Sequence, residues 1–595
     1  MIIIVYSETN STTIGENFGK SEYSYFFVLK EFLPVLRQLG TVFAVNDPFT
    51  EVDAIYRDAT ARGESCIFLS FSPPHRMPLG LACPTIPVFA WEFDSIPTET
   101  WFGEPFQDWR YVLKKTGRAI THSKFAVGAV RAAMGEDFPI ASIPAPLYER
   151  FAGAAAGESL SFLPQTLTWT NGGVIDSRRI DWTNYVRRDN PNRSNFSEEP
   201  PTNIYIPEQE ISLDGVVYTS IFSPYDGRKN YLDILNTFCW AFRDIADATL
   251  AFKLIQHSSR KAIDRLTDEL YRLLPFRCRI VVVDCFLSEV DYIELMLSTT
   301  YAVNASSGEG QCLPLMEYIS AGKPAIAPIH TAMADYISAD NAFVVDTTRA
   351  VTMWPHDPRG AFRTLTNRID CTSLLRAFQD SYHVAKEAPD LYRAMAGNAR
   401  SALQKHCSSE VVRERLSSFL NAEPRSPRIN VDYGRIPVRD ISYALGTTID
   451  FTKEVGARRY LLAGWSGLEL GYGVWSDGAV AELAFALDTE LEAALTFRVH
   501  VTPHISPGHP DIKVTVSANG IDLDQWKFSY VYRDQIAQSR RTVTIPTDAV
   551  TGNELRIKLF IEHPISPWEL GISSDERDLG LALHSLSIAK LRQVS

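Results

Sequence analysis

The chain has 595 residues, 45% of them hydrophobic and 22% charged, which is ordinary for globular proteins and long enough for roughly three or four domains. Its formal net charge of −13 argues against a nonspecific nucleic-acid binder, because binding to a phosphate backbone needs clustered lysine and arginine. A local basic pocket for a diphosphate is compatible with this charge.

The cysteines and the first residues bear on the cellular compartment. None of the eight cysteines forms a Cys-x-x-Cys pair, so free buried thiols in a reducing compartment are favoured over a disulfide framework or a zinc site. The opening MIIIVYSE lacks the basic residues and the length of a signal peptide, and it is interpreted as a buried strand. No apolar stretch approaches the about 20 residues that span a bilayer. We expect a cytoplasmic protein, with peripheral contact at the inner face of the cell membrane left open.

The first part of the chain alternates between apolar runs and amphipathic segments. Helices are predicted for SYFFVLKEFLPVLRQLG and DPFTEVDAIYRDATARG, each of which ends at a glycine. The predicted strands are residues 2–5, 42–45, 67–71 and 86–91. This alternation predicts a parallel sheet covered by helices, with ligands at the C-terminal ends of the strands.

The segment 151–210 breaks this alternation with polar, proline-bearing stretches such as SEEPPTNIYIPEQE. We interpret it as an insertion in an N-terminal domain of residues 1–210, or as a partly ordered arm near the domain boundary. A second Rossmann-like domain is predicted over 211–420, with helical character continuing to about residue 420. Its strands are residues 216–222, 250–255, 279–284, 301–306 and 324–328. Two such domains form a cleft between them, a natural place for a two-substrate reaction.

A linker and a different kind of domain follow. The stretch NAEPRSPRINVDYGRIP carries three prolines, so residues 421–440 are predicted to be a linker. From residue 441 to residue 595 the apolar period changes to two, which predicts an all-β sandwich resembling a jelly roll. The alternating residues are Phe497, Val499, Val501, Ile512, Val514, Val516, Leu555, Ile557, Leu559 and Ile561.

The most informative motif is SSGEGQCLPLMEYISAGKPAIAP, residues 306–328. A strand leads into a glycine-containing loop, and Pro314, with its fixed φ, is predicted to be the first helical residue. Leu313 before it has no side-chain oxygen to cap the helix, so the first backbone N–H groups are predicted to be available to an anionic ligand. Of the two carboxylates, Glu309 lies in the loop and Glu317 lies one turn into the helix.

This stretch resembles the Glu-x7-Glu signature of family-4 retaining glycosyltransferases, which have the GT-B fold of two facing Rossmann-like domains. The chain matches the family pattern at Ser306, Glu309, Gly310, Leu313, Pro314, Glu317, Gly322 and Pro324. It departs from the pattern at Gln311 and Cys312, where the family usually has Phe and Gly. The glycine replaced at 312 normally allows a close approach of the backbone to the donor.

The resemblance implies roles for these residues. Glu309 would contact the donor sugar and Glu317 the ribose, while the backbone around Gly310, Gln311, Cys312 and Leu313 would hold the donor. The leaving diphosphate would help to deprotonate the acceptor, so no strong protein nucleophile is expected. The protein would stabilise the charge that develops on the diphosphate.

A second match is SPYDGRKN, residues 223–230, which resembles the family's basic loop for the donor phosphates. Lys229 stands at the family's lysine with Arg228 beside it, and Ser223 replaces a further arginine. The alternative is a solvated basic pair, although cations at a helix start oppose the helix dipole. That conflict favours phosphate binding.

The N-terminal half offers weaker candidates. The loop GENFGKSEYSYF could bring Gly15 to the diphosphate or be an ordinary surface loop. His75 follows a strand where family members often place a histidine against the donor sugar, and a loop histidine without a role is equally compatible. Glu92, in a Trp-Glu segment similar to one in bacterial polysaccharide glycosyltransferases, could orient an acceptor hydroxyl or cap a helix.

No metal site is predicted. The one Asp-x-Asp, at Asp522 and Asp524, falls in the predicted sandwich, and the resemblance implies metal-independent chemistry. The C-terminal domain is similar to sandwiches attached to surface-polysaccharide glycosyltransferases. Its Trp465, Trp475 and Trp568 could stack on sugars, although core packing is favoured.

The resemblance implies a retaining hexosyltransferase that uses no separate cofactor and takes a sugar from a UDP or GDP donor. The acceptor would be a glycan or a lipid-linked oligosaccharide of a cell-surface polysaccharide such as O-antigen or capsule. The alternatives are a sugar-nucleotide epimerase of the same fold and an inactive carbohydrate-binding protein. Oligomer formation is left open.

Overall fold

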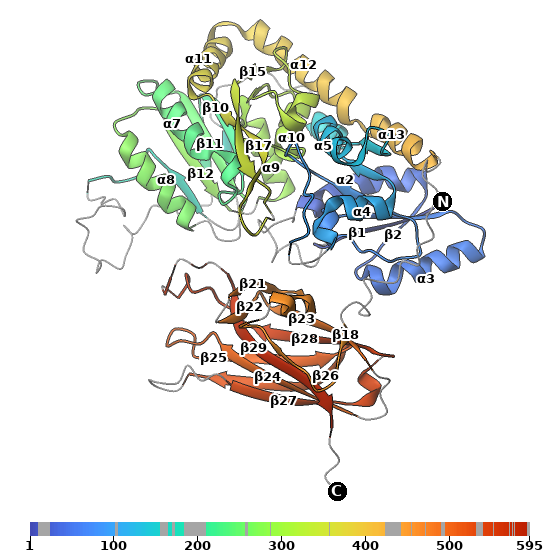
Figure 1. Ribbon diagram of the computed structural model, residues 1–595. Coiled ribbons are helices and arrows are strands. Elements are labelled where there is room, and N and C mark those ends of the chain that lie inside the picture. Colours follow the sequence, from blue (N-terminus) through green and yellow to red (C-terminus); the bar gives the residue numbers. More distant parts are fainter. Residues whose placement is uncertain are drawn as a thin grey trace. The chain divides into compact units, whose positions relative to one another are not determined.

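The computed structural model describes most of the chain. The described residues are 1–9, 24–101, 105–154, 165–168, 173–183, 210–255, 260–422 and 442–591, apart from gaps at 286, 356, 454, 470–471, 489–493, 531–538, 551, 571, 574 and 576. They divide into an α/β unit, residues 1–99 and 106–429, and a β-sandwich unit, residues 100–105 and 430–595. Figure 1 shows the helices and strands of both units.

The N-terminal domain is built on a parallel sheet with the strand order β2-β1-β3-β4-β5-β6. The central strands β1, β3 and β4 are almost entirely buried and mainly apolar, as expected for strands of a parallel sheet with helices on both faces, whereas the edge strand β2 is largely exposed. The strands of this sheet are β1 Ile2–Ser7, β2 Thr41–Ala44, β3 Cys66–Phe71, β4 Thr85–Phe89, β5 Ala119–Thr121 and β6 Ile140–Ser142. The first four were predicted, but the three-residue strands β5 and β6 carry too short a pattern to be seen in the sequence.

The helices of this domain begin at recognisable capping residues. Asp47 accepts a hydrogen bond from the backbone of Phe49 at the start of α3, and Ser123 does the same for Ala126 in α5. The helices are α2 Ser24–Leu39, α3 Pro48–Ala61, α4 Trp109–Thr116, α5 Lys124–Met134 and α6 Tyr148–Ala154. Helices α2 and α3 confirm the two that were predicted.

The second domain has a sheet with the order β15-β14-β13-β10-β11-β12-β8, parallel except for β8. The predicted strands are present, and the segments β10 and β12 agree with the prediction at both ends. Their bounds are β8 Gly173–Asp176, β10 Val216–Phe222, β11 Ala248–Leu254, β12 Arg279–Asp284, β13 Tyr301–Val303, β14 Ala325–Ala327 and β15 Ala342–Val344.

Strand β8 changes the interpretation of residues 151–210. We assigned this segment to the N-terminal domain, but β8 pairs antiparallel with β12 and extends the second sheet. A ribbon of β7 Gln165–Thr168 and β9 Glu210–Leu213 also belongs here, because Leu167 and Ile211 share a core with Val217 and Val281. Strands β7, β8 and β9 therefore belong to the second domain, whereas residues 151–154 form the end of helix α6.

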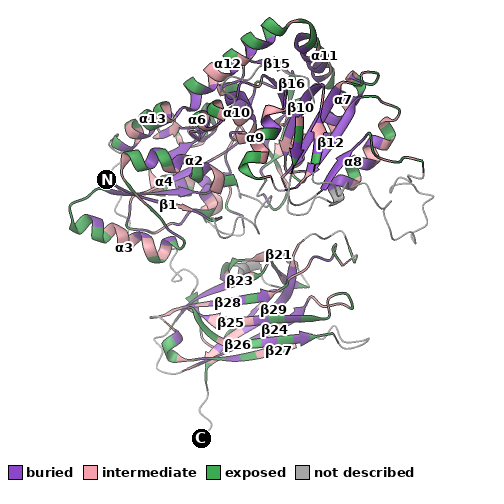
Figure 2. Cartoon of the chain, turned by 180° about the vertical axis from the view of Figure 1, so that it is seen from behind, coloured by how far each residue is buried: buried purple, intermediate pink, exposed green. Residues whose placement is uncertain are grey.

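Helices surround the second sheet, and the last of them return to the first domain. They are α7 Tyr231–Ala241, α8 Arg260–Leu273, α9 Glu289–Leu297, α10 Leu313–Ser320, α11 Cys371–Glu387, α12 Pro389–Cys407 and α13 Ser409–Asn421. Helix α12 packs on α6 and α13 packs on α2, so the chain crosses back to the N-terminal domain. Figure 2 shows α13 and α6 near α2 from the other side.

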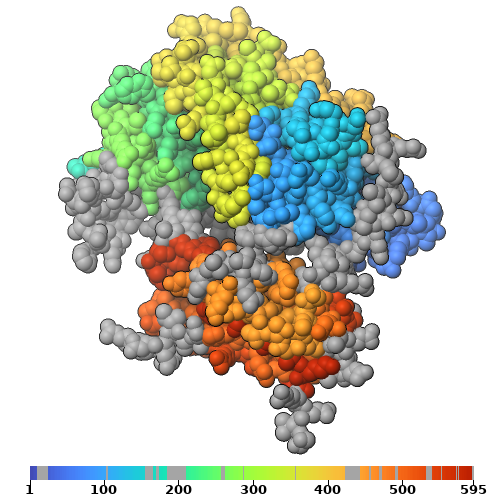
Figure 3. Space-filling view, viewed as in Figure 1, coloured from blue at the N-terminus to red at the C-terminus, as the bar shows by residue number. Residues whose placement is uncertain are grey.

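A β-hairpin interrupts the region where we predicted continuing helix. Strands β16 Thr347–Met353 and β17 Phe362–Ile369 pair antiparallel. Both are rich in threonine and other residues that favour extended backbone, which explains the strand. In the space-filling view this yellow region lies directly against the blue N-terminal domain (Figure 3).

The β-sandwich unit consists of two sheets in which most neighbouring strands are antiparallel. The strand order is β18-β23-β28-β25-β26 in one sheet and β21-β22-β29-β24-β27 in the other. In addition, β20 pairs with β23 and β19 pairs with β29. Its strands are β18 Ser442–Tyr443, β19 Thr448–Asp450, β20 Leu461–Ala463, β21 Trp465–Glu469, β22 Gly473–Asp477, β23 Val480–Leu487, β24 Leu495–Pro503, β25 Asp511–Ala518, β26 Ile521–Ser529, β27 Ser539–Ile545, β28 Glu554–Glu562 and β29 Leu579–Lys590.

The alternating residues that predicted this sandwich form its core. Side chains of both sheets, such as Phe485 of β23 and Phe497 of β24, share one buried cluster. Trp465 packs against that cluster and its Nε1 donates to the carbonyl of Glu482 at 2.8 Å. The predicted architecture, two Rossmann-like domains of the GT-B kind followed by an all-β sandwich, is confirmed.

Candidate functional site

Two loops meet at the C-terminal edge of the second sheet. One follows β10 and carries Arg228 and Lys229, and the other follows β13 and carries Glu309. Strands β10 and β13 are parallel neighbours, so their following loops lie at the same edge of the sheet. The backbone N–H of Ser307 donates to the carbonyl of Arg228 at 2.8 Å, which joins the two loops directly.

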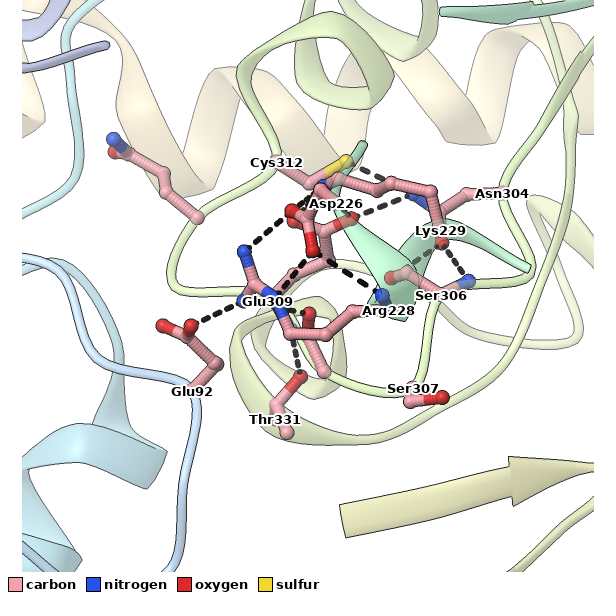
Figure 4. A network of polar contacts seen from close by, with 12 residues as sticks. Glu92, Asp226, Arg228, Lys229, Asn304, Ser306, Ser307, Glu309, Cys312 and Thr331 are labelled. Carbon is pink, nitrogen blue, oxygen red and sulfur yellow. Dashed lines mark hydrogen bonds and ion pairs between the residues drawn. The ribbon is translucent and has the colours of Figure 1, made fainter. Parts of the chain in front are cut away.

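Lys229 and Glu309 form a buried ion pair at the centre of this edge. Lys229 Nζ lies 2.7 Å from Glu309 Oε1 and 2.9 Å from Oε2, and Asn304 Nδ2 donates to Oε1 at 3.0 Å (Figure 4). The backbone N–H of Glu309 donates to Thr331 Oγ1 at 3.0 Å. Glu309 is only 4% exposed. The two residues that the motifs singled out independently are therefore in direct contact.

The charges of this pair support each other. Burial acts to raise the pKa of Glu309, but Lys229 and Arg228 outweigh it and hold that pKa below its usual value. Burial likewise opposes the charge on Lys229, and Glu309 more than compensates, so the pKa of Lys229 is raised. Lys229 remains a cation and Glu309 a carboxylate at neutral pH.

Arg228 is held by carboxylates from both domains. Its Nε and Nη2 donate to Asp226 at 2.9 and 2.7 Å, and its Nη1 contacts the carbonyl of Gly308 at 3.3 Å. Nη1 also donates to Glu92 Oε1, which comes from the segment after β4 in the N-terminal domain. Figure 4 shows Glu92 reaching Arg228 from the side opposite Lys229.

The pKa values of the acids around Arg228 move in opposite directions. Burial, reinforced by Asp226 and Glu309, raises the pKa of Glu92 even though Arg228 lies beside it. Burial also acts to raise the pKa of Asp226, but Arg228 and Lys229 lower it overall. Although burial opposes the charge of Arg228, Glu92 and Asp226 raise its pKa and keep it cationic.

The loop before α10 lies in close contact with the N-terminal domain. A Cβ on Gly310 would stand 2.8 Å from Ala90 Cβ, and one on Gly308 would stand 3.2 Å from the carbonyl oxygen of Glu92. Glycine at these two positions therefore permits the approach of the two domains. The family motif placed Gly310 at the donor, and the structure adds this packing role.

Cys312 keeps the backbone conformation that favours glycine. Its φ of 64° and ψ of 65° are left-handed, as the N-cap residue of α10. The thiol accepts a hydrogen bond from Asn304 Nδ2 at 3.1 Å, and burial raises its pKa. Position 312 thus keeps the left-handed backbone conformation that a glycine would adopt. Its neutral thiol contacts Asn304, which also binds Glu309.

Gln311 and α10 complete the loop. Gln311 Oε1 accepts a hydrogen bond from the backbone N–H of Ala145 in the N-terminal domain. The backbone carbonyl of Gln311 accepts a hydrogen bond from the hydroxyl of Tyr336 at 3.0 Å. Pro314 stands in the first turn of α10, whose N-cap residue Cys312 makes no side-chain capping hydrogen bond. The sequence placed the cap position at Leu313, whereas Leu313 is the first residue of the helix and Cys312 is its N-cap residue.

Glu317 occupies a separate part of the edge. It accepts a hydrogen bond from Tyr292 of α9, and burial raises its pKa to about 7. Arg150, which pairs with Glu289 at 2.9 Å and with Glu31, opposes this rise. The assignment of Glu317 to a ribose stays a prediction.

The remaining predicted residues are placed as follows. The carbonyl of Ser223 accepts the N–H of Asp226 at 3.2 Å, which closes the turn after β10. His75 stacks on Trp109 with a ring separation of 6.0 Å, within the N-terminal domain. Gly15 lies outside the described residues.

Several members of the network were not singled out in the sequence. Asp226 begins the 3₁₀ turn Gly227–Lys229, and its position before Gly-Arg-Lys is a recognisable capping signal. Asn304 follows β13 and Thr331 begins the 3₁₀ turn Thr331–Asp335 after β14, and nothing in the sequence pairs them with Glu309. Glu92 was considered for an acceptor hydroxyl or a helix cap, whereas its described partner is Arg228.

Among the residues that the structure describes, no group of three or more His, Cys, Asp or Glu side chains is arranged to hold a metal ion. No described helix combines the length and the apolar character needed to cross a bilayer.

Comparisons with known proteins give distant structural matches. No family model and no curated sequence matches the chain. Among solved structures, HepE of Anabaena in complex with UDP and glucose has a TM-score of 0.40 and 10% identity, covering 71% of this chain and 99% of HepE. A glycosyltransferase of Rickettsia africae has a TM-score of 0.41 and 12% identity, and the match covers 70% of this chain and 97% of that one. Sucrose-phosphate synthase of Thermosynechococcus elongatus has a TM-score of 0.39 and 13% identity, and the match covers 71% of this chain and 98% of that one.

Proposed function

We propose that this protein is a glycosyltransferase that takes a sugar from a nucleotide diphosphate donor. The observation that carries the proposal is the joining of Lys229, Glu309 and Arg228 at the C-terminal edge of the second sheet, opposite the N-terminal domain. Two cations and an uncapped helix start are suited to a diphosphate. The adjoining carboxylate of Glu309 is suited to sugar hydroxyls.

The expected chemistry follows from the charges of the site. When the sugar leaves, negative charge develops on the diphosphate, and Arg228 and Lys229 stabilise it in the buried surroundings of the site. Lys229 and Asn304 already hold Glu309, which suits a role in orienting the sugar more than one as a nucleophile. We propose that the reaction retains the anomeric configuration, needs no metal ion, and uses UDP or GDP as the carrier.

The acceptor and the setting are proposed from the family resemblance. We propose a glycan or lipid-linked oligosaccharide acceptor in the synthesis of a cell-surface polysaccharide, with transfer of a hexose in the cytoplasm. The half-buried Trp475 and Trp568 of the sandwich unit are outside its main core cluster. They are the candidates there for contact with a sugar chain.

The test is the release of free nucleotide from UDP-, GDP-, dTDP- and CMP-sugars without an acceptor. Lys229→Ala and Glu309→Gln are expected to lose activity by about 100-fold or more, because each removes a group that holds the diphosphate or the sugar. Lys124→Ala and Glu294→Gln change exposed residues of α5 and α9 and serve as matched controls. Both controls are expected to keep full activity.

If the wild type hydrolyses one donor and both site variants fail to do so, the result would support the proposal and identify the nucleotide carrier. The configuration of the released sugar, read by NMR early in the reaction, tests retention. A protein that neither hydrolyses nor binds any of these donors in calorimetry would overturn the proposal.

A further inference from the structure

The cluster around Arg228 contains more acids than bases. Glu92, Asp226 and Glu309 surround Arg228 and Lys229, so three carboxylates face two cations. If all five groups are ionised, this cluster carries one net negative charge before any ligand arrives. A diphosphate brings further negative charge, and binding it here requires that one of the carboxylates separates from its cation or becomes protonated.

The contacts distinguish Glu92 from the other two acids. Glu309 is held through both oxygens by Lys229 and also by Asn304. Asp226 binds Arg228 through both oxygens and also accepts the backbone N–H of Arg228 at 3.2 Å. Glu92 contacts Arg228 through one oxygen and belongs to the other domain. Glu92 is therefore the acid that can separate from Arg228 with the smallest loss of hydrogen bonds.

Resting on the proposed function, we propose that Glu92 is a positioning residue that releases Arg228 and takes up a proton when the donor diphosphate binds. The hydrogen bond of Arg228 Nη1 moves from Glu92 Oε1 to a phosphate oxygen. The proton comes from solvent and makes Glu92 a neutral acid that donates a hydrogen bond. When the nucleotide leaves, Glu92 loses the proton to solvent and pairs with Arg228 again.

The sign of the pH dependence follows from the groups that face Glu92. Arg228 and Lys229 lower its pKa, while burial, Asp226 and Glu309 raise it. Loss of the Arg228 contact and the arrival of a diphosphate both raise this pKa further. The complex then holds more protons than the free protein. Its dissociation constant rises with pH, by up to about tenfold per pH unit, between the free and the bound pKa of Glu92.

The test is calorimetric titration of the full-length protein with UDP and with GDP in buffers of different ionisation enthalpy. The difference in heat between buffers gives the number of protons taken up. The wild type is expected to take up as much as about one proton more than Glu92→Gln. Glu99→Gln is the matched control, because Glu99 lies in the same segment and pairs with Arg359 and Arg363.

The outcomes separate this inference from the proposed function. Greater proton uptake by the wild type and the Glu99 variant than by the Glu92 variant supports it. Equal uptake in all three, with nucleotide still bound, overturns it and leaves the proposed function intact. If neither nucleotide binds, the proposed function fails and this inference fails with it.

A second measurement decides the matter if Glu92→Gln does not fold. The dissociation constant of the wild type is then measured against pH. Ionisation of the nucleotide's own phosphate strengthens binding to cations as pH rises, which is the opposite sign. A dissociation constant that rises with pH therefore supports the role of Glu92, and one that falls or stays constant overturns it.

Discussion

At the scale of single residues, two glycines govern how closely the α/β domains approach. Gly308 and Gly310 lie against the segment from Ala90 to Glu92, where a Cβ would meet atoms of the N-terminal domain. Gly227 stands in the neighbouring loop of the same site, and a Cβ there would meet nothing within 4 Å. The three glycines thus differ in a way that mutation can measure.

Gly310→Ala is expected to reduce nucleotide release by about tenfold or more, because the new Cβ forces the loop away from Ala90 and displaces Glu309. Gly227→Ala is the matched control and is expected to keep activity near that of the wild type. Initial rates and melting temperatures of both variants check this. Full activity in Gly310→Ala would show that the loop tolerates displacement.

At the scale of elements, the hairpin β16–β17 ties the second domain to the segment after β4. Asp94 accepts hydrogen bonds from Thr364 Oγ1 at 2.8 Å and the backbone of Leu365 at 3.0 Å, and it pairs with Arg349 at 2.6 Å. Glu99 pairs with Arg359 and Arg363 at 2.6 and 2.9 Å. Because Glu92 belongs to the same segment, the hairpin also holds the backbone that carries the acid facing Arg228.

Asp94→Ala is expected to lower the free energy of unfolding of the α/β unit by about 1–3 kcal/mol, since it leaves several partners without an acceptor. Asp58→Ala removes an exposed ion pair with Arg62 and is expected to change the free energy of unfolding much less than Asp94→Ala does. Urea unfolding monitored by fluorescence compares the two variants. Equal midpoints would mean that the hairpin contacts add little stability.

At the scale of the whole molecule, the chain contains two units with separate cores. The cluster around Tyr218 and Phe378 belongs to the α/β unit, and the cluster around Phe485 and Phe497 belongs to the β-sandwich unit. A ligand stabilises the unit that binds it, by an amount set by its concentration relative to its dissociation constant.

Scanning calorimetry of the full chain is therefore expected to show two unfolding transitions. A saturating concentration of the nucleotide that binds is expected to raise one of them by about 2–5 °C and leave the other unchanged. The Lys229→Ala variant is expected to show no such rise. A single transition that shifts as a whole would mean that the two units unfold together.

The sequence by itself determined the elements whose pattern is long or whose motif is local. Apolar runs located β10 and β12, and the period of two located the sandwich strands, because burial on one or both faces dictates the residue types directly. The loops after β10 and β13 were identified from local residue types, and the structure brings their Lys229 and Glu309 into direct contact.

Only the tertiary structure decided which distant residues complete the site. Glu92 is 136 positions from Arg228, and Thr331, in the 3₁₀ turn after β14, is 22 positions from Glu309. The pairing of β8 with β12 and the contacts of the β16–β17 hairpin are equally remote in sequence. Hydrogen bonds and ion pairs of this kind depend on how whole elements pack, and local residue patterns carry no record of that packing.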